Sequence, residues 1–463
     1  MASNNEWRLG EFGSRPVRVA NCSGYHGDPA IEMYKQATLG DVDFITGDYL
    51  AEVNMANNAE AYAKGQHPGY EATALKGLEL SIDAIADKRI KVAINGRALN
   101  PEGLAVKVAA LVAEKGCDLK VAYVSGDNVL PKLRKHMLQD RENALAYLDS
   151  LNDHVTLTPE TYIFTKTGDE PREIVSANAY LGAHAIYEAF QQGADIIICG
   201  RASDASPVIA CACDVKAYLD DIEMDQVGQD RVRVYGVRGS PPPETTKLAL
   251  FYKGGYEMQA LFNATGYNFE QKFALVEKQV RFHLGKEKLS HLDFLEFQRI
   301  GVPAVNPANQ NSGTVYLRIF AQSTKVEALQ AIMMAIGNIS LKHYSGFHSS
   351  LDFCSAMPRL YLAYYPALWQ QAKLEEKFHF VDGTGTTKSF NATPPPRFEI
   401  MEERASYDTK SPTPLDGGVL EVRLGSIALG RSGDKGANLN FGLFVDTQAK
   451  WDWLRSYMSR VKV

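Results

Sequence analysis

The chain has 463 residues and a net charge of −6, with 49 Lys or Arg and 55 Asp or Glu. This length predicts two or three domains, and the acidic balance without a long Lys/Arg block argues against a nucleic-acid partner. No segment offers the ~18 consecutive apolar residues of a spanning helix, so we expect no membrane partner.

The first part of the chain, residues 1–230, repeats one pattern. A short β-rich run is followed by a polar or Gly-rich break and then by a helix-like stretch. This alternation predicts an α/β domain in which helices flank a parallel sheet. The five predicted strands are 17–21, 42–46, 90–94, 119–124 and 196–200.

Each of the five breaks carries Asp, Asn or Arg. They supply, in chain order, Asp28, Asp48, Asn95 with Arg97, Asp127 with Asn128, and finally Arg201, Ser203 and Asp204. Ligands of parallel sheets bind beyond the carboxyl ends of the strands, and the following helix N-termini attract anions. The breaks therefore predict a site for an anionic small-molecule substrate. The alternative for any single break is an ordinary turn or helix cap.

The second part of the chain has a different pattern. Residues 231–380 contain alternating strands followed by helix-like stretches, which predicts an α+β domain. Residues 381–416 are rich in chain breakers and predict a linker or loop. Residues 417–463 predict a small C-terminal α+β unit, short for an independent domain, in which strands 419–429 and 438–445 flank the loop 431–436.

The carboxylates at the breaks are candidates for proton transfer. Carboxylates that gather, as Asp48, Asp127 and Asp204 are predicted to do, raise one another's pKa and make one of them a general acid or base. They could instead bind Mg²⁺ through oxygen ligands. Because Cys-x-x-Cys and His-Glu-x-x-His spacings are absent, we predict no metal and keep Mg²⁺ as the less favoured alternative.

His26 follows the first strand and can change charge near neutral pH, so it is a further acid or base candidate; a turn-capping role is the alternative. Cys22 and Cys199 lie at the same edge, where we favour a role as small core residues over nucleophiles. The six cysteines are sparse, and the start lacks a charged region followed by an apolar core. We therefore expect a reduced, cytoplasmic compartment.

The predicted loop 431–436 places charged and hydroxyl groups between glycines. Arg431 and Lys435 would hold an anionic or carbonyl-bearing group, while backbone donors stabilise a developing oxyanion. A solvated hairpin turn is the equal alternative. We assign catalysis to His26, Asp127, Asp204 and Lys435. Substrate binding is assigned to the remaining group, Asp28, Asp48, Asn95, Arg97, Asn128, Arg201, Ser203, Arg431, Ser432 and Asp434.

Six blocks along the chain combine into a specific pattern, at 20–28, 43–50, 95–101, 125–128, 176–183 and 193–204. They resemble the acyclic terpene utilisation proteins typified by AtuA, and residues 431–436 resemble the start of the small C-terminal domain of that family. The resemblance implies breakdown of branched, terpenoid acyl-CoA compounds beside carboxylase and hydratase enzymes, with lyase activity suggested.

Two functions from different classes fit the sequence. The first is an enzyme acting next to a carbonyl of a branched, terpenoid or polyketide-type acid or acyl thioester, by lyase, acyl-transfer or hydrolysis chemistry. It would use oxyanion or enolate stabilisation and general acid-base catalysis, with no cofactor beyond a possible CoA-thioester substrate. The second is a non-catalytic binding or scaffold subunit of an acyl-CoA or secondary-metabolite enzyme complex. We expect a homo-oligomer, of which the homodimer is the commonest form.

Overall fold

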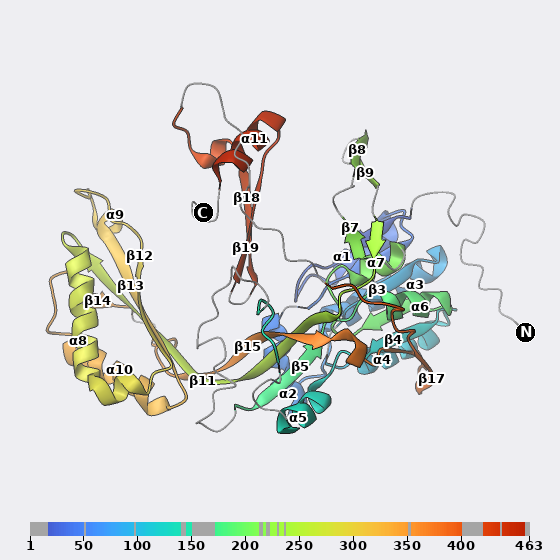
Figure 1. The fold of residues 1–463 in the computed structure, drawn as a ribbon, viewed down its shortest axis with the longest axis horizontal. Helices are drawn as coiled ribbons and strands as arrows, with labels where there is room; N and C mark the ends of the chain where they lie inside the picture. The colour runs from blue at the N-terminus through green and yellow to red at the C-terminus, as the bar shows by residue number, and fades with distance from the viewer. Residues whose placement is uncertain are drawn as a thin grey trace, which may run out of the picture.

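Two large sheets organise the protein, as the computed structural model shows (Figure 1). The first is a mainly parallel sheet near the N-terminus and the second is antiparallel. The described residues are 17–50, 52–96, 99–139, 145–150, 172–212, 216–218, 223–228, 231–235, 238–350, 353–400, 420–435 and 438–458.

The first sheet has seven strands in the order β1-β2-β3-β6-β4-β16-β17. The five strands from β1 to β4 in this order are parallel, whereas β16 and β17 are antiparallel additions at one edge. This confirms the predicted parallel α/β fold, with all five predicted strands in the sheet. The bounds are β1 (Val19–Asn21), β2 (Phe44–Gly47), β3 (Lys91–Ile94), β4 (Val121–Ser125), β6 (Ile196–Cys199), β16 (Lys377–Asp382) and β17 (Gly385–Asn391).

Helices cover both faces of this sheet because its central strands are apolar on both faces. In β6, Ile196 and Ile198 pack in the core that includes α3 and α4, while Ile197 packs with α6. Within the described residues, no helix has the length and apolar character needed to cross a bilayer. The helices of this region are α1 (Ile31–Leu39), α2 (Glu52–Ala63), α3 (Ala72–Lys88), α4 (Pro101–Lys115), α5 (Leu130–Gln139), α6 (His184–Gln191) and α7 (Ser206–Ala212).

The second sheet is built around the long strand β11 (Thr245–Thr265). Its first half pairs with β5 (Ile174–Ala179) and β15 (Arg359–Gln370), and its second half pairs with β13 (Thr314–Ser323) and β14 (His348–Ser349). Figure 1 shows that the second half extends away from the first sheet. This far part also contains α8 (Phe269–Ser290), β12 (Phe294–Ile300), α9 (Gln310–Gly313) and α10 (Val326–Ile339).

The two sheets exchange strands across the predicted domain boundaries. Strand β5 comes from within residues 1–230 but pairs with β11. Strands β16 and β17 return the chain to the first sheet after the second one is complete. The prediction of a linker or loop at 381–416 is therefore wrong for residues 381–382, which end β16, and for residues 385–391, which form β17. Phe390 of β17 stacks on Phe378 with ring centroids 5.0 Å apart, and this contact gives the polar strand an apolar anchor.

The C-terminal unit is a hairpin of β18 (Leu429–Lys435) and β19 (Asn438–Phe444), followed by α11 (Gln448–Tyr457). Two predictions are wrong here. Residues 424–426 form a 3-10 turn within the expected strand 419–429. Residues 431–435 of the expected loop belong to β18, since each pairs with a residue of β19. The remaining short elements are β7 (Lys216–Tyr218), β8 (Glu223–Gly228), β9 (Arg231–Tyr235), β10 (Arg238–Ser240) and the 3-10 turn Gln371–Lys373.

Candidate functional site

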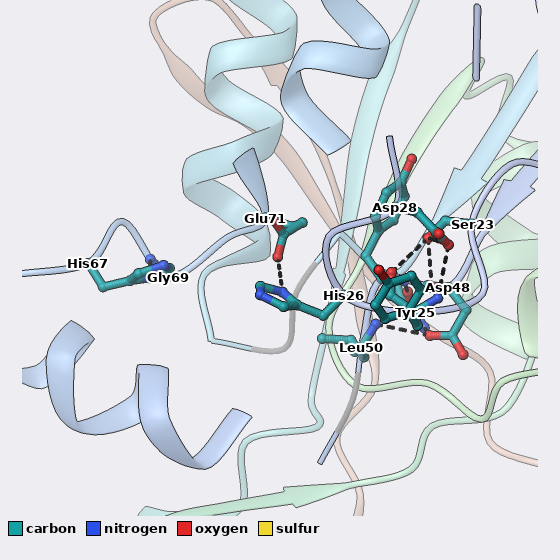
Figure 2. A network of polar contacts seen from close by, with 11 residues as sticks. Ser23, Tyr25, His26, Asp28, Asp48, Leu50, His67, Gly69 and Glu71 are labelled. Atoms are coloured by element: carbon teal, nitrogen blue, oxygen red, sulfur yellow. Dashed lines mark hydrogen bonds and ion pairs between the residues drawn. The ribbon is translucent and has the colours of Figure 1, made fainter. Parts of the chain in front are cut away.

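The carboxyl ends of β2 and β3 bring together Asp48 and Asn95, two of the predicted site residues. Asn95 is fully buried, and its Oδ1 accepts a hydrogen bond from the Tyr49 N–H at 2.8 Å. This contact fixes the amide so that its Nδ2 donates to Asp48 Oδ1. The same oxygen accepts from the Leu50 N–H at 3.2 Å. Asn95 therefore holds the Asp48 carboxyl in one orientation (Figure 2 draws Asp48 and its contact with Leu50).

Asp48 is half-buried and electrostatically coupled to the end of β6. Burial raises its pKa, the negative charge of Asp204 adds to this, and the Asn95 hydrogen bond and the Arg201 charge oppose it. Both hydrogen bonds to the carboxyl go to Oδ1. In the part of the chain that the structure describes, Oδ2 has no hydrogen-bond partner. Asp48 thus combines a raised pKa with one oxygen available for proton transfer.

Arg201 occupies the centre of the strand ends and is only 1% exposed. Its Nη2 donates to Asp204 Oδ1 at 3.0 Å, and its guanidinium carbon lies 3.9 Å from the centre of the Tyr180 ring. The Asp204 side chain is 69% exposed. The arrangement places a buried positive charge between an aromatic face and a carboxylate that reaches solvent.

The first half of β11 adds a second cation to the same edge. Lys247 is half-buried, and its Nζ lies 4.7 Å from the centre of the Tyr180 ring and 5.6 Å from that of Tyr364. The Tyr180 N–H donates to the Lys247 carbonyl at 2.9 Å, which connects the end of β5 to β11. Neither Tyr180 nor Lys247 is among the site residues predicted from the sequence. Tyr180 lies inside the block 176–183, whereas no sequence motif marks Lys247.

Asp127 is a buried hydrogen-bonding group. Asp127 is only 3% exposed. Its Oδ2 accepts hydrogen bonds from Asn178 Nδ2 at 2.8 Å and from the Arg201 N–H at 3.0 Å. Burial raises its pKa to about 6, against the opposing effect of these hydrogen bonds. Gly200 is required beside it, because a Cβ there would overlap the Asp127 carboxyl. These contacts favour a role in ordering the end of β6 over direct contact with a substrate.

Three further predicted residues serve as local hydrogen-bonding groups. Asp28 Oδ2 accepts from the Gly24 N–H at 2.7 Å, from the Tyr25 N–H and from Ser23, and these bonds outweigh partial desolvation and lower its pKa (Figure 2). Asn128 Oδ1 accepts from the N–H of Leu130 at the start of α5. For Asp28 and Asn128, the turn and cap alternatives fit the contacts. Half-buried Ser203 donates its backbone N–H to the Leu181 carbonyl at 2.9 Å.

His26 is directed toward Glu71 and away from the Asp48 carboxyl in Figure 2. Its Nδ1 lies 2.5 Å from Glu71 Oε2, and the Glu71 side chain is buried. The structure therefore separates the His26 imidazole from the Asp48 carboxyl.

Burial raises the pKa of Cys22 to about 11 and also raises that of Cys199. Both thiols remain protonated near neutral pH, which fits core residues better than nucleophiles.

Of the remaining predicted residues, the structure describes the side chains of Arg431 and Ser432. Arg97 and the side chains of Asp434 and Lys435 lie outside the described residues. Arg431 and Ser432 are exposed on β18. Figure 1 shows the β18–β19 hairpin apart from the first sheet, so the structure does not bring Arg431 or Ser432 to Asp204. No group of three His, Cys, Asp or Glu side chains suited to a metal occurs within the described ranges.

The buried Asp127 predicts a specific dependence of stability on pH. Its carboxyl ionises near pH 3.8 in the unfolded chain but near 6 in the folded chain, so the folded state binds more protons between these values. The free energy of unfolding should fall as pH rises from about 4 to 6, by roughly 3 kcal/mol from this group, and then level off. Asp127→Asn keeps an acceptor oxygen and should remove this fall, measured by urea unfolding at pH 4, 5, 6 and 7.

Asp28→Asn is the matched control for that series. The pKa of Asp28 is lowered in the folded chain, so its contribution to stability rises with pH, opposite to that of Asp127. A fall between pH 4 and 6 that is equally steep in wild type and Asp127→Asn would contradict the assignment.

Together, the fold and the site define an α/β protein in which the polar carboxyl ends of parallel strands lie near Lys247 of the antiparallel sheet. The family model described as Acyclic terpene utilisation family protein AtuA matches residues 17–213 and 211–380. The chain therefore belongs to the AtuA family. The match ends at residue 380, so the resemblance of residues 431–436 to the family's C-terminal domain stays a prediction. No curated protein and no solved structure matches the chain.

Proposed function

We propose that this protein is an enzyme acting next to the carbonyl of a branched, terpenoid or polyketide-type acid or acyl thioester. The observation that carries the proposal is the Asp48 carboxyl, which has one oxygen held by Asn95 and Leu50 while the other is available. Its pKa is raised by burial. A fixed carboxyl of this kind suits removal of a proton from the carbon beside a carbonyl.

The positive charges at the edge suit the negative charge that such a reaction develops. Removing a proton next to a carbonyl gives an enolate, whose oxygen needs cationic or hydrogen-bonding groups. Lys247 is half-buried and can reach a bound group, while Arg201 adds positive charge from behind Asp204. A carboxylate or thioester carbonyl placed between Lys247 and Asp48 would meet a cation and a base together.

Proton exchange in D₂O tests this proposal before the complete reaction is known. The purified chain is incubated with isovaleryl-CoA and isovaleric acid as branched probes and with butyryl-CoA as the linear control. Deuterium entering next to the carbonyl, or loss of the thioester, is followed by NMR. Incorporation or turnover with the chain alone supports an enzyme. Binding of a probe by calorimetry, with neither exchange nor thioester loss, would favour the binding-subunit alternative.

A further inference from the structure

A second polar cluster lies in the first sheet where β16 joins the carboxyl end of β4. His379 pairs with Tyr123 across β4–β16 and with Ser389 across β16–β17, and Ser125 lies at the diagonal position on β4. Directly paired and diagonal residues of antiparallel strands share one face and lie within side-chain reach. Strand β4 and the β16–β17 hairpin, which are far apart in sequence, thus place an imidazole between two hydroxyl groups.

The contacts of His379 resemble those of a base beside a nucleophile. Its Nε2 lies 2.9 Å from Ser125 Oγ, and its Nδ1 lies 2.7 Å from Ser389 Oγ. The ring stacks on Tyr123 with centroids 4.4 Å apart and an interplanar angle of 16°. In the tautomer that donates from Nδ1 to Ser389, Nε2 accepts the Ser125 O–H. Nucleophile, base and orienting group are then in hydrogen-bond contact in that order.

The surroundings keep the imidazole neutral and the hydroxyl accessible. Burial lowers the pKa of His379, an effect opposed by the Glu102 carboxylate of α4 and assisted by Lys377 of the same strand. A neutral imidazole is the form that can accept a proton. Ser125 and His379 are half-exposed, and Ser389 is exposed. The cluster can therefore be reached from solvent.

Gly126 sets the approach of the two strands. It has φ +119, and a Cβ there would lie 2.6 Å from the Glu375 carbonyl oxygen, just before β16 begins. Glycine at this position lets the chain entering β16 lie directly against the end of β4. This close approach supports the register that brings His379 to Ser125.

We propose that Ser125 is a nucleophile for activated acyl groups, such as esters and thioesters, with His379 as its base. Ser125 Oγ bonds to the acyl carbon as its proton passes to His379 Nε2. The bond to the alcohol or thiol then breaks, and this leaving group takes the proton. Water attacks the acyl-serine by the same route, releasing the acid and returning the proton to Ser125. The proposal does not depend on the Asp48 site.

A fluorophosphonate probe tests the nucleophile directly. Attack by Ser125 forms an O–P bond, expels fluoride and leaves a stable adduct that peptide mass spectrometry locates. We expect labelling of Ser125 in the wild-type chain and in Asp48→Asn. Ser125→Ala should lose the adduct, and His379→Gln should slow labelling by at least tenfold. Ser312→Ala, at an exposed serine outside this cluster, is the matched control and should label like wild type.

Ser389 is assigned as a positioning residue, and its role has a separate readout. Ser389→Ala should slow labelling and shift the pH at which the rate is half-maximal, because the imidazole loses its Nδ1 partner. Ser389→Thr keeps the hydroxyl and should restore the rate. Folding of each variant is checked by circular dichroism. Absence of labelling in a folded wild-type chain, or equal labelling in folded His379→Gln, would overturn the proposal.

Discussion

Asp48→Asn is expected to slow deuterium exchange next to the substrate carbonyl by a factor of about 10²–10⁴, the usual contribution of a positioned acid or base. The amide keeps an oxygen for the Leu50 N–H but cannot accept a proton at neutral pH. The loss should appear in kcat, with substrate affinity much less affected. Initial rates of exchange in D₂O measure the effect.

The pH profile distinguishes loss of a base from general damage to the site. Burial and the nearby Asp204 charge raise the pKa of Asp48, so its ionised fraction increases over a higher pH range than for an ordinary carboxyl. The wild-type rate should rise with pH through that range and then level off. Residual activity of Asp48→Asn should lack this rise.

Asp204→Asn is the comparison that the sequence itself singles out. Asp204 contacts Arg201 and has an exposed side chain, so the substitution removes a charge partner while leaving Asp48 in place. A complete loss of exchange in folded Asp204→Asn, together with normal exchange in Asp48→Asn, would assign the proton transfer to Asp204 instead.

The parallel sheet could be predicted from the sequence because each of its strands is marked by a pattern within a few neighbouring residues. Each is a short apolar run ended by a polar break, and neighbours β1, β2 and β3 pair in chain order. The gathering of Asp48 and Asn95 follows from this topology alone, since their strands are adjacent and parallel. This part of the site needed no knowledge of distant contacts.

The rest depends on pairings between distant segments, which local patterns do not encode. Lys247 reaches the edge because β11 pairs with β5, more than 60 residues earlier. His379 meets Ser125 because β16 returns to β4 after the second sheet is complete. His26 follows a strand end as expected, but the direction of its side chain is set by Glu71 at the start of α3. Side-chain direction at a loop is a tertiary property.

Asp195 shows how a residue just before a strand can support the whole sheet. Its Oδ1 lies 3.2 Å from Lys91 Nζ, which also donates to the Ala194 carbonyl at 2.6 Å, and its Oδ2 accepts from the Lys120 N–H at 2.8 Å. Lys91 and Asp195 are both nearly fully buried. The pair therefore links β3, β6 and the start of β4 at the end of the sheet opposite the polar breaks.

Asp195→Ala is expected to lower the free energy of unfolding by about 3–5 kcal/mol, because it leaves the Lys91 ammonium buried without its counter-charge. Burial already lowers the pKa of Lys91, and the Asp195 carboxylate opposes that effect, so the substitution should lower the pKa further. Urea unfolding at pH 7 measures the loss. Asp195→Asn retains an acceptor for the Lys120 N–H, so it separates the effect of losing the charge from the effect of losing the hydrogen bond.

The double variant Lys91→Met with Asp195→Ala gives the decisive comparison. Replacing both partners of a buried ion pair is often far less harmful than removing one, because no isolated charge remains. We expect the double variant to regain a large part of the stability that Asp195→Ala loses. The single variant Lys91→Met is measured alongside. If the double variant loses as much free energy of unfolding as Lys91→Met and Asp195→Ala lose together, the cost comes from packing and from the Lys120 hydrogen bond, and the ion pair does not stabilise the sheet.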